Sequence, residues 1–352
     1  MGLKKYVENE IETNEIVEEE ASKEQEEVVE ETVLDELVSV EEEPEAEEDD
    51  DSSFEKEITE KIDNERKNYQ DYYKKQKKTN TLITIGVLVL IVGGFVMMLL
   101  SEKMGGAGIY IGIAILVLSL IATFVTSKFL KDRLSQRAQA YVTTLYDTTN
   151  DYIFNDQNIT DLENKGSMQL SQEVFTDCHF YKNIKGTRNR NYVTLKYRGV
   201  EMISCDLAAN ILIKNRTSPM FLGKFYDYFS NYNNENGVIL FQLKGGELSR
   251  PLDDVDGLKL VEANSKYTIY TNDENYKKVL NDRVLKELLR FKVDKTLIDV
   301  IVSIRHGKVS LGIDYSDEFM NIPVESAFDF KNTKRTKKDF ERVLKVFDLI
   351  NK

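Results

Sequence analysis

Two uninterrupted apolar runs dominate the hydrophobic pattern of this chain. Residues 81–100 (TLITIGVLVLIVGGFVMMLL) and 109–127 (IYIGIAILVLSLIATFVTS) contain no Asp, Glu, Lys, Arg or His. At 1.5 Å per residue, about 20 helical residues cross the ~30 Å hydrocarbon core of a bilayer. Because only residues 101–108 separate the runs, the pattern predicts two antiparallel transmembrane helices, with both ends of the hairpin on one side.

The cations around the runs predict which side that is. Only Lys103 lies in the connecting loop, whereas basic residues gather at the other ends of both runs. Loops rich in Lys and Arg stay in the cytoplasm. A composition rich in Lys, Glu, Asn and Ile without Trp is typical of a bacterium. We therefore expect a two-span, multi-pass protein of the bacterial cell membrane, with both termini cytoplasmic. The cations are Lys67, Lys74, Lys75, Lys77, Lys78, Lys128, Lys131, Arg133 and Arg137.

Both helices are predicted to continue beyond the membrane. Apolar residues recur at helical spacing in residues 54–80 and again in residues 128–149. The two stretches are expected to pair as an antiparallel cytoplasmic stalk. The alternative is that the basic stretch Tyr69–Lys78 lies along an anionic leaflet.

Small residues follow one side of each run, with spacings of three, four and seven. Such residues let helix backbones approach closely where lipid supplies no hydrophobic drive. We expect packing within the hairpin, or a seam between copies in a homo-oligomer. The candidate packing residues are Gly86, Gly93, Gly108, Gly112, Ser119 and Ala122.

In residues 150–352 the pattern is different and consists of short stretches rich in β-branched residues, some with alternating apolar and polar positions. Strands are predicted at 192–197, 201–205, 210–214, 238–243, 267–270, 298–304 and 309–313, and helices at 273–291 and 337–350. His306-Gly307 reads as the turn of a hairpin. Strands in runs with a few helices predict a cytoplasmic α+β domain with a mainly antiparallel sheet.

Charge divides the chain unevenly. Residues 1–53 contain three Lys against 23 Asp or Glu, so a chain of net charge −14 consists of a segment of −20 and a remainder of about +6. Such a segment predicts a disordered acidic tail. It either solubilises the chain or binds a basic surface on this protein or on a partner.

A basic cluster near the C-terminus is the candidate surface for an anionic partner. Five cations occur within eight residues: Lys331, Lys334, Arg335, Lys337 and Lys338. Anionic lipid, an acidic protein or the acidic tail would suit this cluster. Nucleic acid is not expected, because no recognised nucleic-acid-binding motif occurs.

Catalytic chemistry is poorly supported by the sequence. Cys178, His179, Cys205 and His306 have no metal-ligand spacing, and residues 253–257 depart from the calcium-binding EF-hand pattern. The cysteines are expected to be free thiols, and no cofactor is expected. The favoured interpretation is a membrane-anchored binding or scaffold module. The alternative is an enzyme or small-ligand domain that gathers Asp206, Glu201, His179 or Cys205 in a pocket.

A longer pattern resembles a known bacterial family. Its residues are Leu260-Val261-Glu262, Tyr267-Thr268-Ile269-Tyr270, Asp273, Tyr276, Val284-Leu285 and Asp317-Glu318-Phe319. Over roughly residues 60–325 the chain resembles the family called domain of unknown function 3137. Tyr267 stands where that family usually has Phe. The resemblance implies two transmembrane spans followed by a cytoplasmic domain. The family has no established activity, so it implies no functional residue.

Overall fold

A computed structural model describes residues 52–100, 103, 106–166, 168–181, 184–213, 216–243 and 257–352. The predicted acidic tail lies outside the described residues except at its last two positions, as does nearly all of the 253–257 turn. The described chain forms two compact units. One contains a helical hairpin and residues 322–334, and the other contains residues 154–321 and 335–352.

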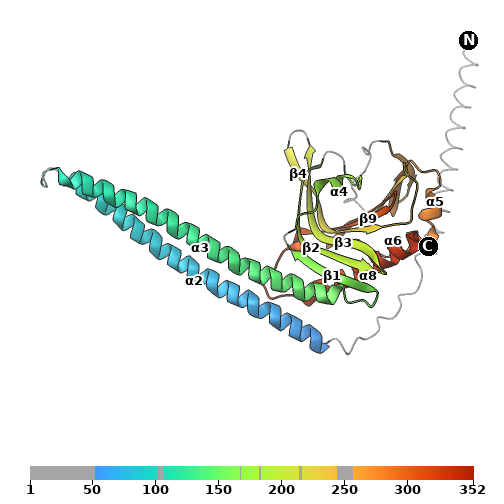
Figure 1. The fold of residues 1–352 in the computed structure, drawn as a ribbon, viewed down its shortest axis with the longest axis horizontal. Helices are drawn as coiled ribbons and strands as arrows, with labels where there is room; N and C mark the ends of the chain where they lie inside the picture. The colour runs from blue at the N-terminus through green and yellow to red at the C-terminus, as the bar shows by residue number, and fades with distance from the viewer. Residues whose placement is uncertain are drawn as a thin grey trace, which may run out of the picture. The chain divides into compact units, whose positions relative to one another are not determined.

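The hairpin consists of two long antiparallel helices, α2 (Ser52–Leu99) and α3 (Ala107–Ile153). Figure 1 shows them side by side along their length. The Tyr69 ring stacks on Tyr141 with centroids 6.2 Å apart, and the Gln76 amide donates to the Leu130 carbonyl. Each helix is about 70 Å long at 1.5 Å per residue. The basic stretch 69–78 therefore pairs with α3, as the predicted stalk requires.

A strap from the C-terminal part of the chain, residues 322–334, is fastened to the base of this hairpin. Tyr141 and Gln70 donate hydrogen bonds to the carbonyls of Pro323 and Val324, respectively. The Asp63 carboxylate accepts a 3.0 Å hydrogen bond from the Phe328 amide. These bonds reach main-chain groups of the strap, so the hairpin holds its backbone directly. The sequence prediction had assigned these residues to the α+β domain.

The other unit contains a nine-stranded sheet in the order β1-β2-β3-β4-β9-β8-β5-β7-β6, with every neighbouring pair antiparallel. This sheet and its helices confirm the predicted α+β class. The strands are β1 (Ile159–Gly166), β2 (Ile184–Tyr197), β3 (Val200–Ile213), β4 (Arg216–Phe229), β5 (Val238–Leu243), β6 (Lys259–Ala263), β7 (Tyr267–Thr271), β8 (Leu297–Arg305) and β9 (Lys308–Tyr315).

Several elements differ from the predicted ones. The strand predicted at 201–205 and residues 210–213 of the strand predicted at 210–214 belong to the single strand β3, whereas residue 214 lies outside the described residues, and β1, β4 and β6 were not predicted. The predicted helix 273–291 is divided into α5 (Tyr276–Val279) and α6 (Asp282–Leu288). The division occurs because the Asn281 side chain accepts from the amides of Arg283 and Val284 and so caps the start of α6. The predicted hairpin turn is confirmed, with Gly307 at φ 68° and His306 exposed.

Each face of the sheet is covered by different elements. Neighbouring residues on a strand point to opposite faces. Phe225 of β4 packs on Phe175 of α4 (Gln172–Thr176), with ring centroids 5.6 Å apart. Tyr226 packs on Phe340 of α8 (Phe330–Ile350) at 5.7 Å. The sheet therefore has an apolar core on both sides.

Both edges of the sheet are protected against further strands. Edge strand β1 contains two register shifts in its pairing with β2, and edge strand β6 contains one in its pairing with β7. Bulges and charged residues at edges discourage pairing with another chain. Strand addition at these edges is therefore disfavoured as a binding mode.

The strap generates the first prediction. Burial opposes ionisation of Asp63, but the Phe328 amide and Arg66 outweigh burial and lower its pKa below the usual 3.8. The Asp63 contribution is thus fully present above pH 3.8 and is lost as the pH falls through the lowered pKa. At neutral pH, Asp63→Asn weakens a hydrogen bond worth about 1 kcal/mol. We expect roughly fivefold faster amide hydrogen exchange in residues 322–329, measured by mass spectrometry.

Asp71→Asn is the matched control, because the Asp71 side chain is exposed on the same helix and has no hydrogen bond within the described chain. Equal exchange in both variants would show that Asp63 does not hold the strap.

Candidate functional site

The apolar segments of α2 and α3 keep their large side chains on the outside of the hairpin. Leu88 is 61% exposed and Leu118 is 65% exposed. Only 6% of the most apolar 18-residue stretch of α2 is buried, and only 17% of the corresponding stretch of α3. Both helices are long and apolar enough to cross a membrane. A core helix of a soluble protein would instead bury such a surface.

Several hydroxyl groups within these segments donate hydrogen bonds to backbone carbonyls of their own helix. Ser119, Thr123 and Thr126 each donate to the carbonyl four residues earlier in α3, at 2.6–2.7 Å. Lipid offers no hydrogen bonds, so a polar group in a membrane span needs a partner inside the protein. These three hydroxyls meet this requirement without a second chain.

The two helices approach closely at Gly94 and Gly112. A Cβ added to Gly112 would lie 2.6 Å from the Gly94 carbonyl oxygen and 2.6 Å from Met98 Cγ. Gly108 and Ser119 are also buried, as packing within the hairpin predicts.

For Gly86, Gly93 and Ala122, the described contacts give no support to packing within the hairpin. An added Cβ at Gly86 or Gly93 meets nothing within 4 Å, and Ala122 is exposed. Gly94 takes the place of its neighbour Gly93, because a helix turns about 100° per residue and only one of two adjacent glycines can face α3. The alternative role of Gly86 and Gly93 in an oligomer seam stays a prediction.

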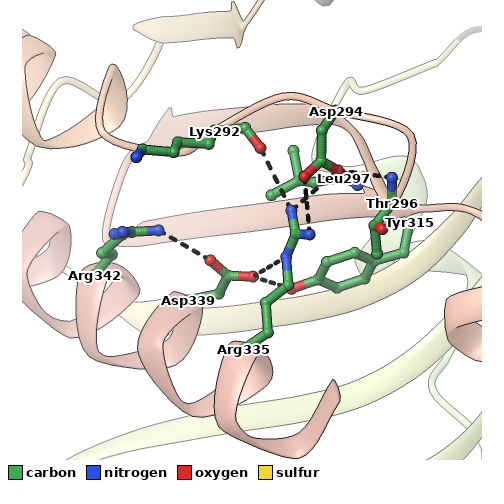
Figure 2. Close-up of polar contacts among 8 residues, drawn as sticks. All are labelled: Lys292, Asp294, Thr296, Leu297, Tyr315, Arg335, Asp339 and Arg342. Atoms are coloured by element: carbon green, nitrogen blue, oxygen red, sulfur yellow. Dashed lines mark hydrogen bonds and ion pairs between the residues drawn. The ribbon is translucent and has the colours of Figure 1, made fainter. Parts of the chain in front are cut away.

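The basic cluster of α8 is partly matched by carboxylates. Lys334 pairs with Glu55. Arg335 donates two hydrogen bonds to Asp294, at 3.0 and 3.2 Å, and lies 4.0 Å from Asp339 (Figure 2). Lys331 and Lys338 are exposed and Lys337 is half-buried. The cluster is therefore less cationic toward a partner than its sequence predicts.

Asp339 joins α8 to the sheet. The Tyr315 hydroxyl donates to its carboxylate at 2.6 Å, and Arg342 lies 3.2 Å away (Figure 2). Burial raises the pKa of Asp339, and the bond from Tyr315 and the charges of Arg342 and Arg335 offset burial only in part. The pKa of Asp294 is shifted in the opposite direction. Its hydrogen bonds with Arg335 and two backbone amides outweigh the effect of burial, so its pKa is lowered. This network fixes α8 in place and has the character of a structural anchor.

The candidate catalytic residues Asp206, Glu201, His179 and Cys205 do not converge on one site. Cys205 and Asp206 are neighbours on β3 and so point to opposite faces of the sheet, and Glu201 is exposed. His179 lies in a turn after α4, at φ 58°.

Both cysteines are free, as predicted, and both are buried. Burial raises the pKa of the Cys178 thiol to about 12, and the thiol donates to the Val174 carbonyl. Such a thiol is a poor nucleophile. Within the described ranges, no group of His, Cys, Asp and Glu could hold a metal ion.

Two buried charge clusters of the sheet were not anticipated. Asp206 pairs with Lys224 at 2.5 Å and with Arg190 at 3.8 Å. Asp227 accepts from Ser310 and pairs with Lys308 at 3.0 Å and Arg305 at 3.4 Å. Their members are distant in sequence and converge only through strand register, so no local pattern could have revealed them.

Comparison of the chain with protein families, with curated proteins and with solved structures finds no match.

The helix crossing generates the second prediction. Gly112→Val places a branched side chain against the backbone of α2, and overpacking of this kind costs about 1–3 kcal/mol. We expect a lower thermal unfolding midpoint, followed by circular dichroism of the intact protein in mild detergent. Gly86→Val is the matched control, because open space surrounds that position. Equal midpoints for the two variants would contradict the crossing at Gly94 and Gly112.

Proposed function

We propose that this chain is a two-span bacterial membrane protein whose α+β unit is a cytoplasmic binding or scaffold module. One observation carries the proposal: α2 and α3 display charge-free apolar surfaces over about 20 residues each, and the hydroxyls of Ser119, Thr123 and Thr126 in α3 are bonded to carbonyls of their own helix. Removal of apolar surface from water is favourable by about 25 cal/mol per Å², and the hairpin alone leaves this gain unrealised. Insertion into a bilayer would supply it.

The orientation follows from the cations. Seven basic residues lie close to the ends of the apolar segments that face away from the connecting loop, and the loop itself contains only Lys103. This bias supports a cytoplasmic location for both termini. It also leaves only a short turn on the outer side of the cell membrane.

Binding is favoured over catalysis because the candidate catalytic residues are dispersed and the thiols are unreactive in character. We propose an anionic lipid or an acidic protein as the partner, with homo-oligomer formation through the hairpin as a further interaction. Membership of the family called domain of unknown function 3137 is part of the same proposal, and it is supported by the order of spans and domain together with the 260–319 pattern.

Cysteine accessibility in intact cells tests the topology. The two native cysteines are buried, so single added cysteines report selectively. We expect Lys103→Cys to react with a membrane-impermeant maleimide from outside. Asn68→Cys, in the exposed part of the α2 stalk, should react only after permeabilisation.

The chain should also stay in the membrane pellet after carbonate extraction. Release by carbonate would contradict the anchor. Labelling of Asn68→Cys from outside would contradict the orientation.

A further inference from the structure

Seven cations form a basic collar around the hairpin where its charge-free segments end. They are Lys74, Lys75, Lys77 and Lys78 on α2 and Lys128, Lys131 and Arg133 on α3, and all seven are exposed. At 1.5 Å per residue they lie within about 10 Å of Thr81 or Ser127. The bond between Gln76 and Leu130 shows that the two sets lie at the same level of the hairpin.

The collar cations have no carboxylate partners, unlike several cations of the α+β unit. In that unit Lys224, Arg305 and Lys308 each pair with a buried Asp. Throughout the described residues, no ion pair joins a collar cation to a carboxylate. Asp71 and Asp132 are the acidic residues within residues 71–78 and 128–133, and both are exposed. The collar thus presents seven positive charges against two negative charges.

This arrangement does not stabilise the hairpin itself. Lys74 and Lys78 are four residues apart on one helix, and Lys74–Lys77 and Lys75–Lys78 are three apart. Like charges at these spacings repel each other by about 0.2–0.5 kcal/mol per pair. An external anion would reverse the sign of this interaction.

We propose that the collar binds the headgroups of anionic phospholipids. The inference rests on the proposed membrane anchor, which would place the collar at the headgroup level. A headgroup layer would surround both helices and so meet cations that point in different directions. Each Lys or Arg near an anionic leaflet contributes about 1 kcal/mol, or roughly a fivefold change in association. The acidic residues 1–51 are the competing occupant, although nothing about their sequence requires binding at this level of the hairpin.

Lipid selectivity of the reconstituted full chain tests the proposal. The chain is placed in phosphatidylcholine vesicles with 20% phosphatidylglycerol, and spin-labelled forms of each lipid report the fraction immobilised at the protein. At about 0.1 M salt we expect phosphatidylglycerol to associate at least threefold more strongly than phosphatidylcholine. At 1 M salt the Debye length falls to about 3 Å, and the ratio should approach one.

Matched triple variants locate the effect. Lys74→Gln/Lys75→Gln/Lys78→Gln should lose at least half of the selectivity. Lys56→Gln/Lys61→Gln/Lys67→Gln removes the same charge from exposed positions of α2 that lie about 20 Å or more from Thr81, and it should keep the wild-type ratio.

Equal association of the two lipids with the wild-type chain at low salt would overturn the proposal and favour residues 1–51 as the occupant. Equal losses in the two triple variants would also overturn it, because the selectivity would then reflect net charge. Absence of immobilised lipid of either kind would instead show that the anchor itself is wrong.

Discussion

Removal of the apolar surface of α2 and α3 from water is the constraint on which the rest of this structure depends. The hairpin cannot cover that surface itself, because two helices bury only the side of each that faces the other. Fully burying one large apolar side chain gains about 1.5–3 kcal/mol, so the exposed set amounts to tens of kcal/mol. That sum exceeds the 5–15 kcal/mol by which a typical domain is stable. The length and composition of two adjacent 20-residue segments match a bilayer-spanning hairpin, and this match supports the membrane anchor that we propose.

Charge is distributed in accordance with the same constraint. Within the α+β unit, Asp206, Asp227 and Asp339 are buried and each lies beside two cations, which joins strands and α8 into one body. Around the ends of the charge-free segments, cations are exposed and have no such partners. The first arrangement is suited to holding a fold together, and the second to meeting an anionic surface. The strap, residues 322–334, is hydrogen-bonded to the hairpin, whereas the residues that precede and follow it in sequence belong to the α+β unit.

The sequence predicts elements whose pattern is local and misses those that depend on distant residues. The charge-free runs and the strands β5, β7, β8 and β9 are readable from sequence because these strands are rich in apolar and β-branched residues and are buried at almost every position. Strand β4 is hidden by Pro219 and by Gly223, whose missing side chain is needed because a Cβ would lie 1.8 Å from the Ile313 carbonyl oxygen. The choice of Gly94 over Gly93, and the pairing of Arg335 with Asp294, are likewise decided by packing. The basic cluster of α8 therefore looked more open in sequence than it is in the fold.

The depth of the apolar segments is the most direct test of the central claim. A spin label attached at Leu88→Cys can be compared with one at Asn68→Cys in the reconstituted chain, using collisions with oxygen and with a polar nickel complex. Oxygen concentrates in lipid and the nickel complex in water. The account predicts that oxygen dominates at position 88 and the nickel complex at position 68. Free access of the nickel complex to position 88 would show that the helix does not lie in the bilayer.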